Sequence, residues 1–224
     1  MTAVAPATDA PVVQIDIVSD VMCPWCIVGY KQLEQALGMV GAGAYVRWHP
    51  FELNPDMPPE GQNLGEHIAQ KYGSTPAQSA QNRDRLAQLG DSLGFSFDFT
   101  PDSRIVNTFG AHQLLDWAQA HGLQHPLKMA LFDAHFRAGK DVSNHAVLVE
   151  IAASVGLDPD QATGVLNSGS QAEETRTRQQ FWTSRGISGV PSMVFDGRYL
   201  LTGAQGAETY AQMLTKVIAE KDAA

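Results

Sequence analysis

The chain has 224 residues, of which 44% are hydrophobic, so it can bury a large core and is not an intrinsically disordered protein. It carries 15 Lys and Arg against 24 Asp and Glu, and this net charge of −9 argues against a nucleic-acid partner because phosphates would be repelled. No apolar run approaches the roughly 18 residues of a membrane helix, so we expect no membrane partner either.

The first segment, residues 1–11, has no Lys or Arg and no long apolar run. It therefore lacks the basic and apolar regions of a secretory signal peptide. We predict a disordered tail over residues 1–11 and a cytoplasmic location.

A β-α-β unit is predicted next. Residues 12–18 form an apolar, β-branched run typical of a buried strand, and residues 44–53 contain the next strand signal. Between them, apolar residues recur at helical spacing from Cys26 to Leu37. The sequence Cys-Pro-Trp-Cys at 23–26 therefore lies where the strand meets the helix, and Pro24 suits the first helical turn.

Cys23 and Cys26 are the only cysteines. Two cysteines are too few for a disulfide scaffold, and no histidine pair follows them at zinc-finger spacing, so we expect no metal site. A C-x-x-C pair at a strand-to-helix junction indicates redox chemistry. The helix N-terminus lowers the pKa of Cys23, so we predict an exposed nucleophile at Cys23 and a buried resolving thiol at Cys26. Two inert core cysteines are the alternative.

The rest of the chain changes character twice. Residues 54–65 are rich in Pro and Gly, and residues 66–185 have helical periodicity. Residues 186–222 then predict a strand, an Asp196-Gly197 turn, a second strand and a final helix. Neither half of the sheet makes a stable core alone. We predict one domain from residues 12–65 and 186–222, interrupted by a helical subdomain at 66–185.

This order, βαβ and then ββα with C-x-x-C opening the first helix, resembles the thioredoxin fold, an α/β fold. The large helical insertion and the Cys-Pro-x-Cys motif resemble the DsbA family of thiol–disulfide oxidoreductases. Five segments are similar to the FrnE-type cytoplasmic subgroup of that family: DVMCPWC at 20–26, WHPFELNP at 48–55, NTFGAH at 107–112, GISGVP at 186–191 and GAQ at 203–205.

The resemblance implies a site built from Cys23 and Cys26 and shaped by Pro24, Trp25, Val190 and Pro191. Pro191 would be a cis-proline beside the active-site disulfide, and the backbone of Val190 would face Cys23 and bind an extended substrate. No cofactor and no metal are implied, although glutathione could serve as reductant. The partners would be protein or small-molecule thiols and disulfides, and the oligomeric state is left open.

The sequence also departs from its relatives. DsbA carries His where this chain has Trp25, so the thiolate should be less stable and the disulfide less oxidising. The acidic residue that thioredoxin-like proteins bury below the resolving cysteine would fall on Ile17. Asp16 is one position away, and we do not assign it as a proton acceptor. The second cysteine pair of some FrnE-type proteins is missing.

Three functions compete. The first is a disulfide reductase or isomerase that uses the cysteine pair. The second is a glutathione-dependent isomerase or kappa-class transferase-like enzyme, which typically has Ser in place of Cys23; the presence of Cys26 argues against it. The third is a non-catalytic binding module that uses the groove beside Pro191.

Other candidate residues receive structural roles. We expect a surface or capping role for His49, a helix cap at Asn107 and a satisfied, half-buried position for His112. Three more residues are expected in the core rather than in a substrate pocket: Phe132, His135 and Phe136.

Overall fold

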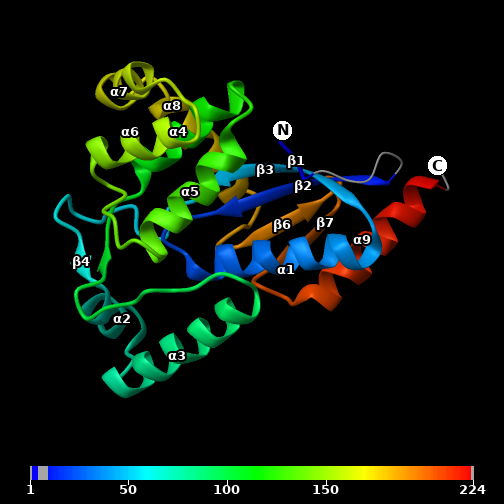
Figure 1. The fold of residues 1–224 in the computed structure, drawn as a ribbon, viewed down its shortest axis with the longest axis horizontal. Coiled ribbons are helices and arrows are strands. Elements are labelled where there is room, and N and C mark those ends of the chain that lie inside the picture. The colour runs from blue at the N-terminus through cyan, green and yellow to red at the C-terminus, as the bar shows by residue number, and fades with distance from the viewer. Residues whose placement is uncertain (1, 5–9, 223–224) are drawn as a thin grey trace.

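The computed structural model describes residues 2–4 and 10–222, and its centre is a five-stranded sheet in the order β1-β3-β2-β6-β7 (Figure 1). Strands β2 and β3 are parallel, and the other neighbours are antiparallel. The strands are β1 (Thr2–Val4), β2 (Val12–Ser19), β3 (Gly43–Pro50), β6 (Ser192–Phe195) and β7 (Tyr199–Thr202).

Strand β1 corrects one prediction. Thr2–Val4 lie in the segment expected to be a disordered tail, yet they pair with Val46, Tyr45 and Ala44 of β3. Backbone hydrogen bonds to an edge strand do not depend on the helix or signal-peptide patterns that we searched for. The prediction of a tail is therefore wrong at these residues, and positions 5–9 lie outside the described residues.

One face of the sheet is covered by α1 (Pro24–Val40) and α9 (Ala207–Asp222), which pack side by side in Figure 1. Alternate residues of β2 point to this face, and Val13, Ile15 and Ile17 are completely buried. They share a core with Leu33 of α1, and Cys26 belongs to the same core. The strand-helix-strand pattern read from the sequence thus holds the cysteine motif at one end of the sheet.

Seven helices form the insertion between β3 and β6, and a short β4–β5 pair lies among them. The predicted fold, a thioredoxin domain with a large helical insertion, is confirmed. The elements are β4 (Gln62–Asn63), α2 (Leu64–Tyr72), α3 (Pro76–Ser92), β5 (Arg104–Ile105), α4 (Phe109–Ala120), α5 (Gln124–Phe136), α6 (His145–Ser154), α7 (Pro159–Ser168) and α8 (Ala172–Thr183).

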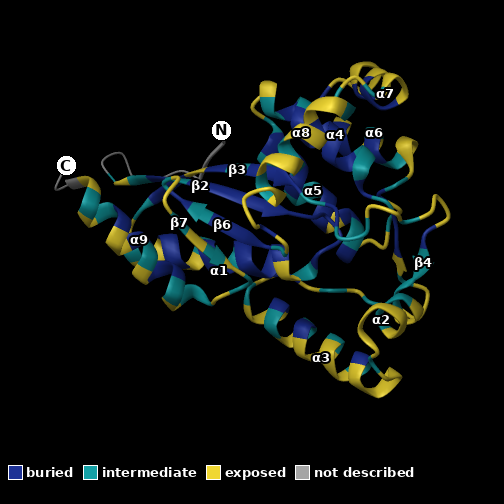
Figure 2. Ribbon diagram, turned by 180° about the vertical axis from the view of Figure 1, so that it is seen from behind, coloured by how far each residue is buried: buried dark blue, intermediate teal, exposed yellow. Residues whose placement is uncertain are grey.

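Burial is uneven across the insertion. Figure 2 shows β2, β3 and the inner sides of α4 and α5 as largely buried, whereas α3 is mostly exposed. Helices α4 to α7 contribute to a second core, which includes Leu114, Leu127 and Leu148. Among the described residues, no helix is both long and apolar enough to cross a bilayer.

The predicted hairpin between β6 and β7 is confirmed. Phe195 pairs with Tyr199, and the turn between them holds Asp196 and Gly197 at positive φ angles of 53° and 68°. Asp and Gly tolerate this left-handed conformation better than most residues. The hairpin completes the sheet beside β2 and brings the preceding loop, with Val190 and Pro191, toward the start of α1.

Candidate active site

The two cysteines lie at the N-terminus of α1. Cys23 is the N-cap residue, with an extended backbone (φ −89°, ψ 109°), and Pro24 occupies the first turn. The amide of Cys26 donates to the carbonyl oxygen of Cys23 at 3.0 Å. Both residues are free thiols, and a spacing of three residues brings them to the same side of the helix.

The burial of Cys23 differs from the sequence-based expectation. Its side chain was predicted to be exposed, but only 4% of the residue is accessible, against 0% for Cys26 and 43% for Trp25. A second segment explains the difference, because the Cys23 thiol donates to the carbonyl oxygen of Val190 at 3.6 Å. Cys23 nonetheless remains the more accessible of the two sulfur-bearing residues.

The segment that covers Cys23 has a specific backbone geometry. The Val190–Pro191 peptide bond is cis, and the carbonyl of Pro191 accepts a hydrogen bond from the amide of Gly203 at 2.7 Å. Pro191 packs on α1 at Gly29, where an added Cβ would lie 3.1 Å from the proline ring. Glycine at position 29 is therefore what lets the proline segment approach the cysteine helix closely.

The two thiols titrate as a pair, and their order is the reverse of the prediction. Burial raises the pKa of Cys26, but the neighbouring Cys23 thiol, the charge of Lys128 and the Ser19 hydroxyl outweigh burial and lower it. The hydrogen bond to Cys26 and burial raise the pKa of Cys23 instead. The first ionisation of the pair is thus favoured, and a second thiolate beside the first is disfavoured.

A buried carboxylate lies just before the motif. Asp20 is 1% exposed, and its oxygens accept from the amides of Met22 at 3.3 Å and Leu53 at 2.7 Å. His112 of α4 lies 3.4 Å from the same carboxylate and also contacts the carbonyl oxygen of Phe51 at 3.1 Å. Burial raises the pKa of Asp20, but the bonds from His112 and Leu53 lower it overall, so the group stays ionised.

Helix α5 is fixed to the sheet next to this site by polar bonds. Gln124 accepts from the amide of Trp48 at 3.0 Å and donates to its carbonyl at 2.9 Å, as a neighbouring strand would. His125 accepts from the indole nitrogen of Trp48 at 3.0 Å, so its proton sits on Nε2, 3.1 Å from the hydroxyl of Tyr30. These bonds set the position of α5 relative to the cysteine core.

Lys128 lies one turn further along the same face of α5, and sequence reasoning missed it. It is 1% exposed, and its ammonium lies 5.4 Å from the ring centre of Trp48 and 4.9 Å from that of Phe132. Burial lowers the pKa of Lys128 to about 8. Lysine between apolar residues in a helical pattern is normally read as solvent-exposed, so only the packing of α5 reveals this residue.

Asp16 and His49 form a second polar pair away from the cysteines. His49 Nε2 lies 2.8 Å from Asp16 Oδ1, and the imidazole packs on Trp182 of α8 with ring centres 4.7 Å apart. They line a cavity of about 560 Å³ on the face of the sheet opposite α1. The surface role expected for His49 is wrong, because α8 covers it. Ile17 points into the core with Cys26, so no carboxylate stands at that position.

The remaining sequence candidates take structural roles. The N-cap of α4 is Thr108 and not Asn107 as predicted, although the Asn107 side chain accepts from the first helical amide, that of Phe109, at 2.9 Å. Phe132 and Phe136 lie in the core, as predicted. His112 is more deeply buried than expected, at 1% exposure. Within the described part of the chain, no group of three or more His, Cys, Asp or Glu residues could hold a metal ion.

Comparison with known proteins identifies the family. The sequence profile of the DSBA-like thioredoxin domain matches residues 14–215. The chain belongs to this family. Its members are thiol–disulfide oxidoreductases that act on thiol and disulfide substrates without a prosthetic cofactor.

Three solved structures illustrate the likeness. A probable DsbA oxidoreductase from Streptomyces coelicolor is 30% identical, with a TM-score of 0.87 over 93% of this chain and 91% of the other. The cytosolic disulfide reductase DsbM of Pseudomonas aeruginosa, solved with GSH, is 18% identical (TM-score 0.62; 91% and 98% covered). A 2-hydroxychromene-2-carboxylate isomerase is 13% identical (TM-score 0.65; 93% and 98% covered). The last two likenesses are of fold alone.

Proposed function

We propose that this DsbA-like protein reduces or isomerises disulfides, with Cys23 as the nucleophile and Cys26 as the resolving thiol. The observation that carries the proposal is the pairing of a C-x-x-C motif at a helix N-terminus with the Val190 carbonyl 3.6 Å from the Cys23 sulfur. The exposed Trp25 lies between the two cysteines in the sequence. Thiol–disulfide exchange needs this combination of a stabilised thiolate and a second thiol within reach.

Access determines which sulfur attacks. The two thiols titrate as a coupled pair, so either sulfur can carry the negative charge that the pair acquires on its first ionisation. Cys26 has no accessible surface, and Cys23 retains 4%. The negative charge therefore rests on Cys26, whose pKa is lowered, and Cys23 is the sulfur that attacks a substrate.

The reaction has two exchanges. The Cys23 thiolate attacks a substrate disulfide, a mixed disulfide forms, and the first substrate thiolate leaves. Cys26 then attacks the Cys23 sulfur, closes the Cys23–Cys26 bond and releases the second substrate thiolate. The substrate gains two electrons and the cysteine pair loses two. Two equivalents of a small-molecule thiol such as GSH would reduce the pair again by two exchanges and leave joined as a disulfide.

The loop before β6 is the proposed substrate platform. The carbonyl of Val190 faces Cys23, and the flanking backbone can bond to an extended segment as an added strand does. Pro191 is buried against α1 and gives this platform a fixed base. The cytoplasmic location stays a prediction.

Trapping tests the proposal. We expect Cys23→Ala to abolish insulin reduction. Cys26→Ala should retain the first attack and accumulate mixed disulfides, because no second thiol is present to release them. Rapid alkylation followed by non-reducing and reducing gels would detect these adducts, with the double Cys23→Ala, Cys26→Ala variant as the matched control.

Two results would contradict the proposed function. Adducts formed by Cys23→Ala and not by Cys26→Ala would reverse the roles of the cysteines. Wild-type protein that neither reduces insulin nor shuffles a scrambled substrate would exclude a disulfide reductase or isomerase.

A further inference from the structure

Lys128 is a charged group enclosed in the core of the molecule. It comes from α5 of the insertion, yet its ammonium lies over the rings of Trp48 and Phe132, and both belong to the core that contains Cys26. None of the hydrogen bonds and ion pairs between described residues involves this ammonium. A buried ammonium is strongly unfavourable unless a negative charge compensates it or the group loses its proton.

The candidates for that charge are few. Negative charge on Cys26, Asp20 or Cys23 raises the pKa of Lys128 and so opposes the effect of burial, with Cys26 first among them. Asp20 is already satisfied by His112 and by two backbone amides. On α5 itself, burial lowers the pKa of His125 and of His135, so both are neutral near pH 7. The thiolate of the cysteine pair is the negative charge left without a fixed partner.

We propose that Lys128 is the counter-ion of the Cys23–Cys26 thiolate and the acceptor of the proton that Cys26 gives up. The proposal rests on the proposed exchange reaction and adds a residue from the insertion to it. The position is fixed by the two bonds of Gln124 to Trp48, one helical turn before Lys128 on the same face of α5.

The second exchange requires such an acceptor. Cys26 has no accessible surface in the dithiol form, so a buried group is better placed than water to take its proton when Cys23 is held in the mixed disulfide. The neutral amine of Lys128 accepts this proton, the Cys26 thiolate attacks the Cys23 sulfur, and the bond from Cys23 to the substrate breaks. The departing substrate thiolate takes a proton from solvent, and the Lys128 ammonium returns its own to solvent when the thiolate is gone.

Oxidation then changes the environment of Lys128. Once the Cys23–Cys26 bond has formed, only Asp20 remains among the negative charges that act on the ammonium. Lys128 should therefore lose its proton at lower pH in the oxidised protein than in the reduced protein. This linkage ties proton uptake by Lys128 to the redox state of the pair.

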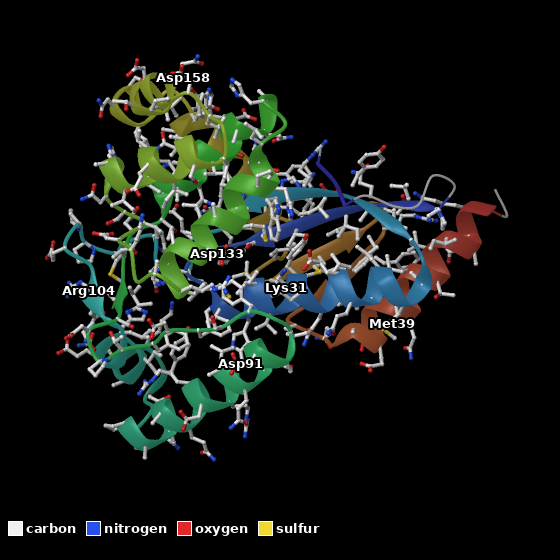
Figure 3. The ribbon with its side chains drawn as sticks, in the orientation of Figure 1. Lys31, Met39, Asp91, Arg104, Asp133 and Asp158 are labelled. Atoms are coloured by element: carbon white, nitrogen blue, oxygen red, sulfur yellow. The ribbon has the colours of Figure 1, made fainter. Side chains whose placement is uncertain are left out.

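Thiolate absorbance near 240 nm against pH tests the proposal on the full reduced chain, with the oxidised chain as blank. We expect Lys128→Met to raise the pH of the first thiolate ionisation by at least one unit. At a given pH below this ionisation, the variant would then contain about tenfold less thiolate than the wild type. Lys31→Met is the matched control, because Lys31 of α1 is a partly exposed lysine that pairs with Glu34 (Figure 3). A Lys128→Met titration that overlays the wild type would overturn the proposal.

A second measurement needs no variant and applies if Lys128→Met does not fold. NMR titration of isotope-labelled lysine side chains in the wild type should give a lower pKa for the buried lysine after oxidation. Equal values in both redox states would overturn the proposal. Neither titration uses a substrate, so a protein that titrates as expected but fails to exchange disulfides would contradict the proposed function and not the role of Lys128.

Discussion

The two buried cores of the molecule contribute differently to the cysteine pair. The core between the sheet, α1 and α9 contains both sulfurs, and the core of the insertion contains neither. Helix α5 belongs to both: Leu127 and Leu131 pack in the insertion core, whereas Phe132 and Phe136 pack in the cysteine core. The insertion thus places Lys128 beside a site whose reactive atoms lie on the thioredoxin-like half.

Because α5 packs in both cores, we expect the thioredoxin-like half and the helical insertion to unfold together. Leu33 of α1 and Leu114 of α4 are both completely buried, one in each core. We expect Leu33→Ala and Leu114→Ala each to lower the free energy of unfolding by about 2–5 kcal/mol, because each leaves a cavity. Urea unfolding followed by tryptophan fluorescence and by circular dichroism should give one transition for both probes in both variants.

Leu200→Ala is the control for that experiment. Leu200 lies on the edge strand β7 and is 50% exposed, so the free energy of unfolding should change by no more than about 0.5 kcal/mol. Two separated transitions in Leu114→Ala, with the cysteine core unfolding later, would mean that α5 does not couple the cores.

A narrower change breaks only the junction between the halves. Gln124→Met removes both hydrogen bonds to Trp48 and leaves a buried backbone N–H and C=O without partners. We expect the free energy of unfolding to fall by about 1–3 kcal/mol. The first thiolate ionisation should also shift upward, since α5 no longer holds Lys128 in place. Gln88→Met, at an exposed position of α3, should change neither quantity; an unaltered stability in Gln124→Met would show that other contacts hold α5.

The sequence predicted the fold and the cysteine motif because both depend on local patterns. Alternating apolar residues in β2, the helical spacing after Cys26 and the Asp196-Gly197 turn each identify an element without reference to distant residues. The burial of Cys23 was missed because Val190 lies 167 positions away in the chain. Tertiary contacts of this kind leave no periodic signal.

The same dependence on tertiary contacts explains why the sequence did not predict the burial of Lys128 and His49. Each follows an ordinary helix or strand pattern, and each becomes buried only when a helix of the insertion packs on β3. The alternation of Gln14 and Asp16 with Ile15 and Ile17 did contain a usable signal. It indicated a polar side of β2, and the parallel register sets Gln14 opposite Tyr45 and Asp16 opposite Arg47. Burial of that polar side by α8 is the part that the alternation could not reveal.

The smallest expected effect concerns acid. Burial lowers the pKa of His135, on the shared helix α5, to about 4, against about 6.5 in an unfolded chain. Between these values the unfolded chain binds a proton that the native state does not, so stability is lost as the pH falls from about 6.5 toward 4. Burial also lowers the pKa of His125, so this histidine too makes the native state less stable as the pH falls. Acid should therefore weaken α5 and, through it, both cores.

His135→Gln tests this link. Between pH 7 and pH 5.5 the wild type should lose free energy of unfolding on the order of 1 kcal/mol through His135, and the variant should lose less. Urea midpoints at the two pH values measure the difference, with His145→Gln at an exposed position as the control. Because α5 packs in both cores, the wild-type loss should appear in one cooperative transition. A loss of the same size in His135→Gln and in the wild type would mean that His135 does not cause the acid sensitivity. The effect of acid on the two cores would then have to be explained without α5.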